Sequence, residues 1–208
     1  MSFLLNYPDY VINTIMAPRE YFRHHREQGT EIREGLKIAF VSSILLGLFS
    51  SVRSVIAVSF GEFSTGIGSS ELASTVLRNS LSGSLTYLIS LLLSFVLVHI
   101  MVKTLGSSDW KKTFNAITYS SPLVFLTGSV IVGYQLIESF IIGFPLIRYL
   151  GLGAVLFYTA YVQARGLEAL HEMSFGRSIV ATITPAVVSV LASVAVFIMY
   201  MSMMLSAI

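Results

Sequence analysis

Long apolar stretches alternate with short polar segments along this chain. A transmembrane helix needs about 20 mostly apolar residues, and five stretches reach that length, at 36–57, 81–102, 116–137, 141–162 and 179–205. Backbone that crosses lipid satisfies its own hydrogen bonds when it is helical. The pattern therefore predicts an all-α fold, an integral membrane bundle of five transmembrane helices that forms one membrane domain over residues 31–208.

The first 30 residues carry a different pattern, in which apolar and charged positions share short helices. Pro8 suits a first helical turn, and the apolar residues of Val11–Met16 recur at helical spacing. Pro18 can begin a second helix and Gly29 can end it. Aromatic and basic residues mix in this second helix, which is typical of amphipathic helices that lie among lipid headgroups. Residues 1–30 are therefore predicted to be an amphipathic, interfacial N-terminal segment.

Composition excludes several classes of protein. Hydrophobic residues make up 54% of the chain and charged residues only 12%, whereas soluble domains carry about 25% charged residues. A soluble enzyme, a disordered chain and a nucleic-acid-binding protein all need more charge than this. The sequence has no cysteine, which removes disulfides, cysteine-ligated metals and thiol nucleophiles. The composition therefore indicates a membrane protein that does not bind nucleic acid.

The basic residues are distributed unevenly between the two sides of the predicted bundle. With the N-terminus inside, ten of the 13 lysines and arginines fall in inner segments, and Arg53, Arg78 and Arg148 fall outside. Short cytoplasmic loops of membrane proteins carry an excess of these residues. We therefore predict a multi-pass protein with a cytoplasmic N-terminus. Because five spans are an odd number, its C-terminus is predicted to be extracytoplasmic.

No arrangement of residues typical of catalysis or metal binding occurs in the sequence. The patterns His-Glu-x-x-His, Gly-x-Ser-x-Gly and the phosphate-binding Gly-Lys-Ser are all missing. The ionisable side chains in the predicted spans are Arg53, His99 and Arg148, without aspartate or glutamate, which counts against proton- or sodium-coupled transport. We expect no enzymatic activity, no catalytic or metal-ligating residue and no cofactor.

Two inner segments combine aromatic and basic side chains, which favours contact with anionic lipid headgroups. In the second of them, Ser107 or Ser108 is predicted to cap a helix that contains Trp110, the only tryptophan. Tryptophan is enriched at membrane interfaces. A third inner segment, residues 165–177, is predicted to form a short polar helix of its own. The residues predicted to contact lipid or a protein partner are Arg19, Phe22, Arg23, Arg26, Trp110, Lys111 and Lys112.

Small residues at four-residue spacing mark one face of several spans. Ser43, Gly47 and Ser51 share a face of the first span, and Ser189 and Ser193 share a face of the fifth. Such faces let helix backbones approach closely. Packing within the bundle is the favoured interpretation, and association into a homo-oligomer or the lining of a polar path are the alternatives.

Three segments share features with one family of multi-pass membrane proteins. They are Ala17-Pro-Arg-Glu-Tyr-Phe22 before the first span, Gly106–Pro122 before the third, and Gly166–Arg177 between the fourth and fifth. On these segments the chain resembles the Yip1-domain family, in particular its shorter, prokaryotic-type members. The residues that occupy family-motif positions are Pro18, Tyr119, Pro122 and Arg177.

The resemblance implies an all-helical bundle with five spans and an inner N-terminus. Eukaryotic relatives are implicated in vesicle trafficking, and are said to engage prenylated small GTPases and to help shape membranes. This chain has a short N-terminal segment and lacks the acidic Asp-Leu-Tyr-Gly-Pro type of motif near the first span. The resemblance therefore does not carry GTPase binding over to this sequence.

Two functions remain after these steps. The leading hypothesis is a non-enzymatic, Yip1-type membrane protein that acts as a membrane-organising or trafficking-like adaptor through its cytoplasmic face. Its expected partners are anionic lipid headgroups and an unidentified protein on the cytoplasmic side. The alternative is a small transporter or channel component with a polar path between the first, second and fifth spans, and with His99 near the inner mouth.

Overall fold

The computed structural model describes residues 2–29, 31–60, 69–140, 145–188 and 199. Every regular element within these ranges is a helix, and the described residues contain no strand. The predicted all-α class is therefore confirmed. Three helical stretches are long and apolar enough to cross a membrane, over Ile32–Ser59, Glu71–Thr104 and Trp110–Glu138. They coincide with the first three predicted spans.

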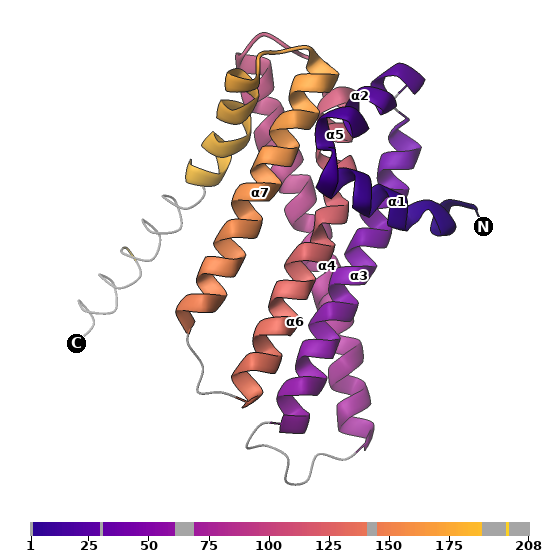
Figure 1. Cartoon of the computed structure of the whole chain (residues 1–208), viewed down its shortest axis with the longest axis vertical. Helices are drawn as coiled ribbons and strands as arrows, with labels where there is room; N and C mark the ends of the chain where they lie inside the picture. The colour runs from indigo at the N-terminus through magenta and orange to yellow at the C-terminus, as the bar shows by residue number, and fades with distance from the viewer. Residues whose placement is uncertain (1, 30, 61–68, 141–144, 189–198, 200–208) are drawn as a thin grey trace.

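Four long helices run side by side along the molecule (Figure 1). They are α3 (Ile32–Phe60), α4 (Ser69–Thr104), α6 (Val124–Phe140) and α7 (Pro145–His171). Helix α3 packs against both α4 and α6, and α6 packs against α7. The predicted fourth span falls mostly on α7. The predicted fifth span begins in a shorter apolar helix, Phe175–Val188, and the rest of it lies outside the described residues.

Close approach between α3 and α4 depends on small residues. A Cβ atom at Gly47 would lie 2.4 Å from the carbonyl oxygen of Ser80, so only glycine fits there. The Ser51 hydroxyl lies 2.9 Å from the carbonyl oxygen of Val76. Ser43 is buried and bonds to the carbonyl oxygen of Phe40 in its own helix. The first-span residues predicted to pack helices thus lie at or near this contact, whereas Ser189 and Ser193 lie outside the described residues.

Three short helices gather at one end of the bundle. Helix α1 (Ser2–Met16) crosses the long axis, whereas α2 (Pro18–Gln28) and α5 (Trp110–Tyr119) lie at the tip, where α7 ends (Figure 1). We call α1, α2 and α5, together with the adjoining ends of α3, α4 and α7, the cap. The largest fully buried side chains belong to it or lie directly beneath it, among them Phe22, Ile38, Ile117, Tyr119 and Leu167. The cap therefore contains the main core of the described structure.

Two expected boundaries are wrong in the cap. Asp109, not Ser107 or Ser108, caps α5, because its carboxylate accepts hydrogen bonds from the backbone N–H groups of Lys111 and Lys112. No separate polar helix forms over residues 165–177. Helix α7 instead continues to His171, because Leu167 and Leu170 are buried at helical spacing in the cap core.

A tight turn follows α7, and a short 3₁₀ segment divides the third predicted span. Glu172 adopts a φ of 57° in the turn, and the next helix starts at Phe175. Pro122 lies in the 3₁₀ turn η1 (Ser121–Leu123), which separates α5 from α6. Proline lacks the N–H that an uninterrupted helix needs at this point. The third span is therefore built from two helices that meet at this proline.

Candidate functional site

Helix α2 is anchored in the cap by one aromatic side chain. Pro18 occupies the first turn of α2, and Phe22 is 0% exposed, with its ring against Gly166 of α7. A Cβ atom at Gly166 would lie 2.9 Å from the Phe22 ring. The prediction that Phe22 contacts lipid or a partner is therefore wrong. An apolar stripe on a short helix looks the same in sequence whether it faces lipid or protein.

The three arginines of α2 reach the surface and pair with carboxylates. Arg23 bonds to Glu27 of the same helix at 3.0 Å. Arg26 lies 3.2 Å from Glu172, and Arg19 lies 4.0 Å from Glu168. Each exposed pair contributes about 0–1 kcal/mol to stability. Their contact with lipid stays a prediction, and the pairs show that part of their charge is already balanced within the cap.

The start of α5 presents the other predicted contact residues. Trp110 is 46% exposed and Lys111 is exposed, whereas Lys112 is partly buried. Thr113 and Ile117, one and two turns further along the same helix, are buried in the cap. Helix α5 thus holds an aromatic and a basic side chain outward on a fixed support. Their contact with lipid or a partner stays a prediction.

Two histidines meet beside α5 through hydroxyl groups. His171 Nδ1 lies 2.6 Å from the Ser107 hydroxyl, and its Nε2 lies 3.1 Å from the Thr113 hydroxyl. His99 Nδ1 lies 3.2 Å from the same Thr113 oxygen. Burial, with a smaller contribution from Lys112, lowers the pKa of His171 to about 4. His171 is therefore neutral at physiological pH. The pair is not visible in the sequence, because its members are far apart in the chain and share no motif.

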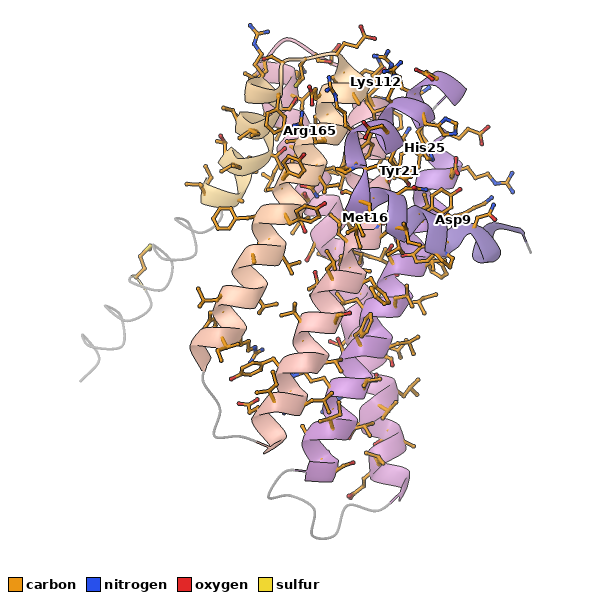
Figure 2. The ribbon with its side chains drawn as sticks, in the orientation of Figure 1. Asp9, Met16, Tyr21, His25, Lys112 and Arg165 are labelled. Carbon is orange, nitrogen blue, oxygen red and sulfur yellow. The ribbon has the colours of Figure 1, made fainter. Side chains whose placement is uncertain are left out.

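A partly open cavity of about 440 Å³ lies among α1, α2 and the start of α3. We call it the acidic pocket. Figure 2 shows Asp9 on α1 and Tyr21 and His25 on α2 at the same side of the cap. No lysine or arginine is among its lining residues. The lining side chains that matter for its chemistry are Asp9, Tyr10, Glu20, Tyr21, His25 and Glu34.

Two tyrosines, Tyr10 and Tyr21, line the acidic pocket. The Tyr10 hydroxyl donates a hydrogen bond to Glu34 Oε1 at 2.5 Å, and burial together with this carboxylate raises the pKa of Tyr10 above its usual range. Tyr21 is 6% exposed, and burial raises the pKa of its hydroxyl well above 10. The nearby Thr14 lowers the pKa of this hydroxyl, but by less than burial raises it. Among the described residues the hydroxyl makes no hydrogen bond of normal geometry. Both tyrosines are therefore protonated at neutral pH.

A second cavity, of about 550 Å³, lies within the bundle. We call it the bundle cavity. Its walls come mainly from α4, α6, α7 and the helix Phe175–Val188, whereas α3 contributes Leu46. Most of the lining surface is apolar. Polar side chains interrupt it at several positions, among them Ser90, Ser94, Thr159, Gln163 and Thr182.

The segments that carry the family resemblance converge on the cap. Tyr119 is fully buried, and its hydroxyl donates to the carbonyl oxygen of Glu31. The rings of Tyr119 and His25 have centroids 4.7 Å apart, which joins α5 to α2. Pro122 follows in η1, and Arg177 is exposed on the helix that begins after α7. Three segments that are distant in sequence thus meet in the cap.

Comparison with known proteins agrees with this assembly. The family model described as the Yip1 domain matches residues 12–197, which cover most of the chain. The matched range contains the cap helices α2 and α5 and the long helices of the bundle. No curated protein and no solved structure shows a significant match.

Proposed function

Because this chain belongs to the Yip1 domain family, we propose that it is a non-enzymatic adaptor that organises membrane or recruits a protein partner at its cytoplasmic face. The observation that carries this proposal is the cap. Its helices are held by a buried aromatic core, and its outer surface presents Arg19, Arg23, Trp110 and Lys111. The proposed partners are anionic lipid headgroups and a protein on the cytoplasmic side.

The support beneath these exposed side chains favours recognition over a passive charged leader. Phe22 fixes α2 against α7, and Thr113 and Ile117 fix α5. A surface that is already ordered loses less conformational entropy when a partner binds. A solvated leader without buried anchors would have to be ordered by the partner. The cap therefore offers a preformed surface of mixed aromatic and basic character.

The arrangement of α1 supports an interfacial location for residues 1–30. Helix α1 crosses the bundle axis (Figure 1), and Ile12 and Met16 are 56% and 81% exposed on it. Exposed apolar side chains on a helix in this orientation are suited to the boundary between headgroups and acyl chains. Each nearby lysine or arginine would add about 1 kcal/mol of attraction to anionic lipid.

Five spans are the topology we propose, with residues 31–208 as the membrane domain. Helix α7 has 27 residues, which corresponds to about 40 Å at 1.5 Å per residue, longer than the hydrocarbon core of about 30 Å. Its last turns contact α2 and α5 in the cap. Helix α7 starts at the end of the bundle away from the cap and finishes in the cap. It therefore has to cross the same thickness of membrane as α6. A fifth span from residue 179 would then leave the C-terminus extracytoplasmic.

Photo-crosslinking in native membranes tests the adaptor role. A crosslinking amino acid replaces Lys111 in the cap or, as the matched control, Glu71 at the opposite end of α4; both positions are exposed. We expect a discrete protein adduct from position 111 and none from position 71, with identification by mass spectrometry. Adducts of equal yield and identity at the two positions would contradict the proposal.

The bundle cavity favours a second candidate, a small transporter or channel component. Ser90 and Ser94 of α4 face it together with Thr182 of the following helix, so parts of the second and fifth predicted spans meet there. The Ser43, Gly47 and Ser51 face of the first span is not part of its lining. Flux of small polar solutes into proteoliposomes tests this candidate. If the protein is a transporter or channel component, flux should exceed that of empty liposomes. The Ser94→Leu variant should then show clearly lower flux.

A further inference from the structure

We infer that the bundle cavity binds a neutral acylglycerol, with one acyl chain inside the bundle and the free glycerol hydroxyl beside Gln163. The cavity lies mainly among α4, α6, α7 and the helix Phe175–Val188. The inference goes beyond the adaptor proposal, which uses the exposed surface of the cap, and does not depend on it. It also differs from the transport candidate, because a bound lipid would fill the space that a solute path needs.

The packing of the long helices explains why this space exists. Helix α3 packs against α4 and α6, and α6 packs against α7, whereas α4 and α7 make no extensive contact in the described part of the chain. The cavity lies between these two helices and has a volume of about 550 Å³. Sites for small molecules usually measure about 300–1,000 Å³. The space between α4 and α7 therefore has the size of a ligand site.

The cavity lies within the membrane-spanning part of the bundle, and exposed apolar side chains border it. Its α4 residues belong to the apolar stretch Glu71–Thr104. Among the lining residues, Leu156 is 70% exposed and Leu93 is 59% exposed. A side chain that both lines the cavity and reaches the outer surface marks an opening toward the surrounding membrane. An acyl chain can therefore enter from the bilayer without crossing water.

The cavity wall carries no charge. None of the described residues that line it is an aspartate, glutamate, lysine, arginine or histidine. A charged group inside would have no counterion, and a buried charge without a partner is strongly destabilising. Apolar cavities in proteins also stay free of water and take up apolar molecules instead. A ligand headgroup held in this cavity must therefore be neutral.

The Gln163 amide provides the hydrogen-bonding groups that a neutral headgroup needs. Gln163 is partly buried at the cavity, and its side chain forms no hydrogen bond with another residue in the described part of the chain. The hydroxyls of Thr159 and Thr182 already donate to carbonyl oxygens of their own helices. Polar groups removed from water normally have a hydrogen-bond partner. The unpaired amide therefore indicates where the headgroup binds.

The chemistry of the amide selects the headgroup. Its Nε2 group donates and its Oε1 atom accepts. A free glycerol hydroxyl can donate to Oε1 while the neighbouring ester carbonyl accepts from Nε2, whereas a plain hydrocarbon would leave both groups unpaired. Gln163 lies about two turns nearer the cap than Leu156 on α7. The headgroup would therefore lie toward the cap, and the acyl chain would extend away from it along Leu156 and Leu91, which both line the cavity.

Saturable photolabelling of the full chain tests the inference. The protein is reconstituted in phosphatidylcholine vesicles that contain a trace of diacylglycerol with a diazirine on one acyl chain. After irradiation, peptide mass spectrometry should locate adducts on the cavity-lining residues of α4 and α7. We expect excess unlabelled diacylglycerol to reduce these adducts at least tenfold. Adducts that excess diacylglycerol does not reduce would overturn the inference, because they report only the surrounding bilayer.

Two competitors with the same acyl chains test the headgroup. Acetylated diacylglycerol lacks the free hydroxyl, and phosphatidic acid carries a charged phosphate in its place. We expect each of them to be at least tenfold less effective than diacylglycerol at reducing the adducts. Competition of equal strength by all three lipids would overturn the inference.

Variants locate the site in the cavity. Gln163→Leu removes the amide but leaves room for the chain, so the advantage of diacylglycerol over its acetylated form should fall below threefold. Ala160→Leu places a larger side chain in the cavity and should lower the saturable labelling at least fivefold. Thr86→Leu is the matched control, because Thr86 is exposed on α4 outside the lining. Labelling and headgroup preference that stay unchanged in both cavity variants would overturn the inference.

A crosslinking amino acid at Leu156 tests for a competing occupant from the chain itself. Most of the segment after Val188 lies outside the described residues. Capture of diacylglycerol at position 156 supports the inference, whereas capture of this segment in place of the lipid would overturn it. The solute flux and the crosslink at position 111 are measured separately, so a failure of one proposal is not mistaken for a failure of another.

Discussion

The middle of helix α4 and the face that it turns into the cap have very different surroundings. In the middle, Leu85, Ile89 and Leu92 are each more than half exposed, whereas Val98 and Val102, on the opposite face near the cap, are 2% and 0% exposed. The first group is as apolar as the second, so hydrophobicity does not separate them. The difference is what covers them: protein at the cap, whereas in the middle of α4 no described part of the chain covers these side chains and acyl chains are expected there. The fold is thus specified mainly at the cap, and lipid replaces protein contacts over the rest.

The same comparison distinguishes the polar groups. At the cap, side-chain hydrogen bonds join α1 to α5, α2 to α7, α5 to α7 and α5 to α3 across large sequence separations. Away from it, Ser51, Arg53 and Ser54 join α3 to α4 or α6, but other hydroxyls bond to a carbonyl oxygen one turn back in their own helix, as Ser50, Ser90 and Thr159 do. Bonds of the first kind fix tertiary structure, whereas bonds of the second kind only satisfy a polar group in an apolar medium.

The largest effect is expected for Phe22→Ala. Removing a fully buried aromatic side chain costs about 3–5 kcal/mol, and Phe22 is the main contact between α2 and Gly166. Leu85→Ala, at an exposed apolar position of α4, should cost less than about 0.5 kcal/mol. Reversible unfolding in mixed detergent micelles measures both. Equal losses at the two positions would remove the distinction between the cap and the lipid-facing part of the bundle.

A smaller loss is expected where α3 meets α4. Gly47→Val places its Cβ against the backbone of Ser80 and should cost about 1–3 kcal/mol. Gly133→Val on α6 is the control, because no atom lies within 4 Å of the Cβ position there. Thermal stability in the same detergent distinguishes the two. A control as unstable as Gly47→Val would show that helix propensity, not close packing, explains the loss.

Acid should weaken the cap through His171. Its pKa is about 4 in the folded protein and about 6.5 in an unfolded chain. The unfolded state therefore binds more protons between these values, and stability decreases as pH falls from 6.5 toward 4. Because the side chain is partly exposed, we expect a loss of only about 1–2 kcal/mol. Unfolding measured across this range should show a shallower loss in His171→Gln; parallel pH profiles would contradict the assignment.

The smallest effect is expected for the surface ion pairs. Arg26→Gln removes the pair with Glu172 and the bond to the carbonyl oxygen of Ala169, which should change stability by less than about 1 kcal/mol. Arg23→Gln, which loses only a pair within α2, should change it less. Chemical unfolding of both variants gives the comparison. A loss at Arg26 as large as that of Phe22→Ala would mean that ion pairs, not the aromatic core, hold α2.

The sequence predicts the long helices but not how they pack against one another in the cap. Apolar length predicts a span whatever its neighbours are, so α3, α4 and α6 follow from the pattern. The burial of Phe22 does not follow, because an amphipathic stripe does not say whether lipid or protein covers it. The continuation of α7 through Leu167 and Leu170 was missed for the same reason, since their partners lie on α2 and α5.

The acidic pocket was not predicted from the sequence either, although one sequence feature is related to it. An acidic residue directly precedes a tyrosine twice, at Asp9-Tyr10 and at Glu20-Tyr21. The pairs are 11 residues apart on two helices, and only the turn at Ala17 brings them to one cavity together with Glu34. The recurrence of an acidic residue followed by a tyrosine is visible in the sequence. Its geometry depends on how α1 and α2 fold onto α3.

Single-cysteine labelling tests the central claim, that the cap is the cytoplasmic face, most directly. The natural chain has no cysteine, so Arg23→Cys in the cap and Glu71→Cys at the opposite end each provide one reactive site without background. With a membrane-impermeant maleimide on intact cells, the account predicts labelling of Glu71→Cys and no labelling of Arg23→Cys until the membrane is opened. Labelling of Arg23→Cys in intact cells, with Glu71→Cys protected, would contradict it.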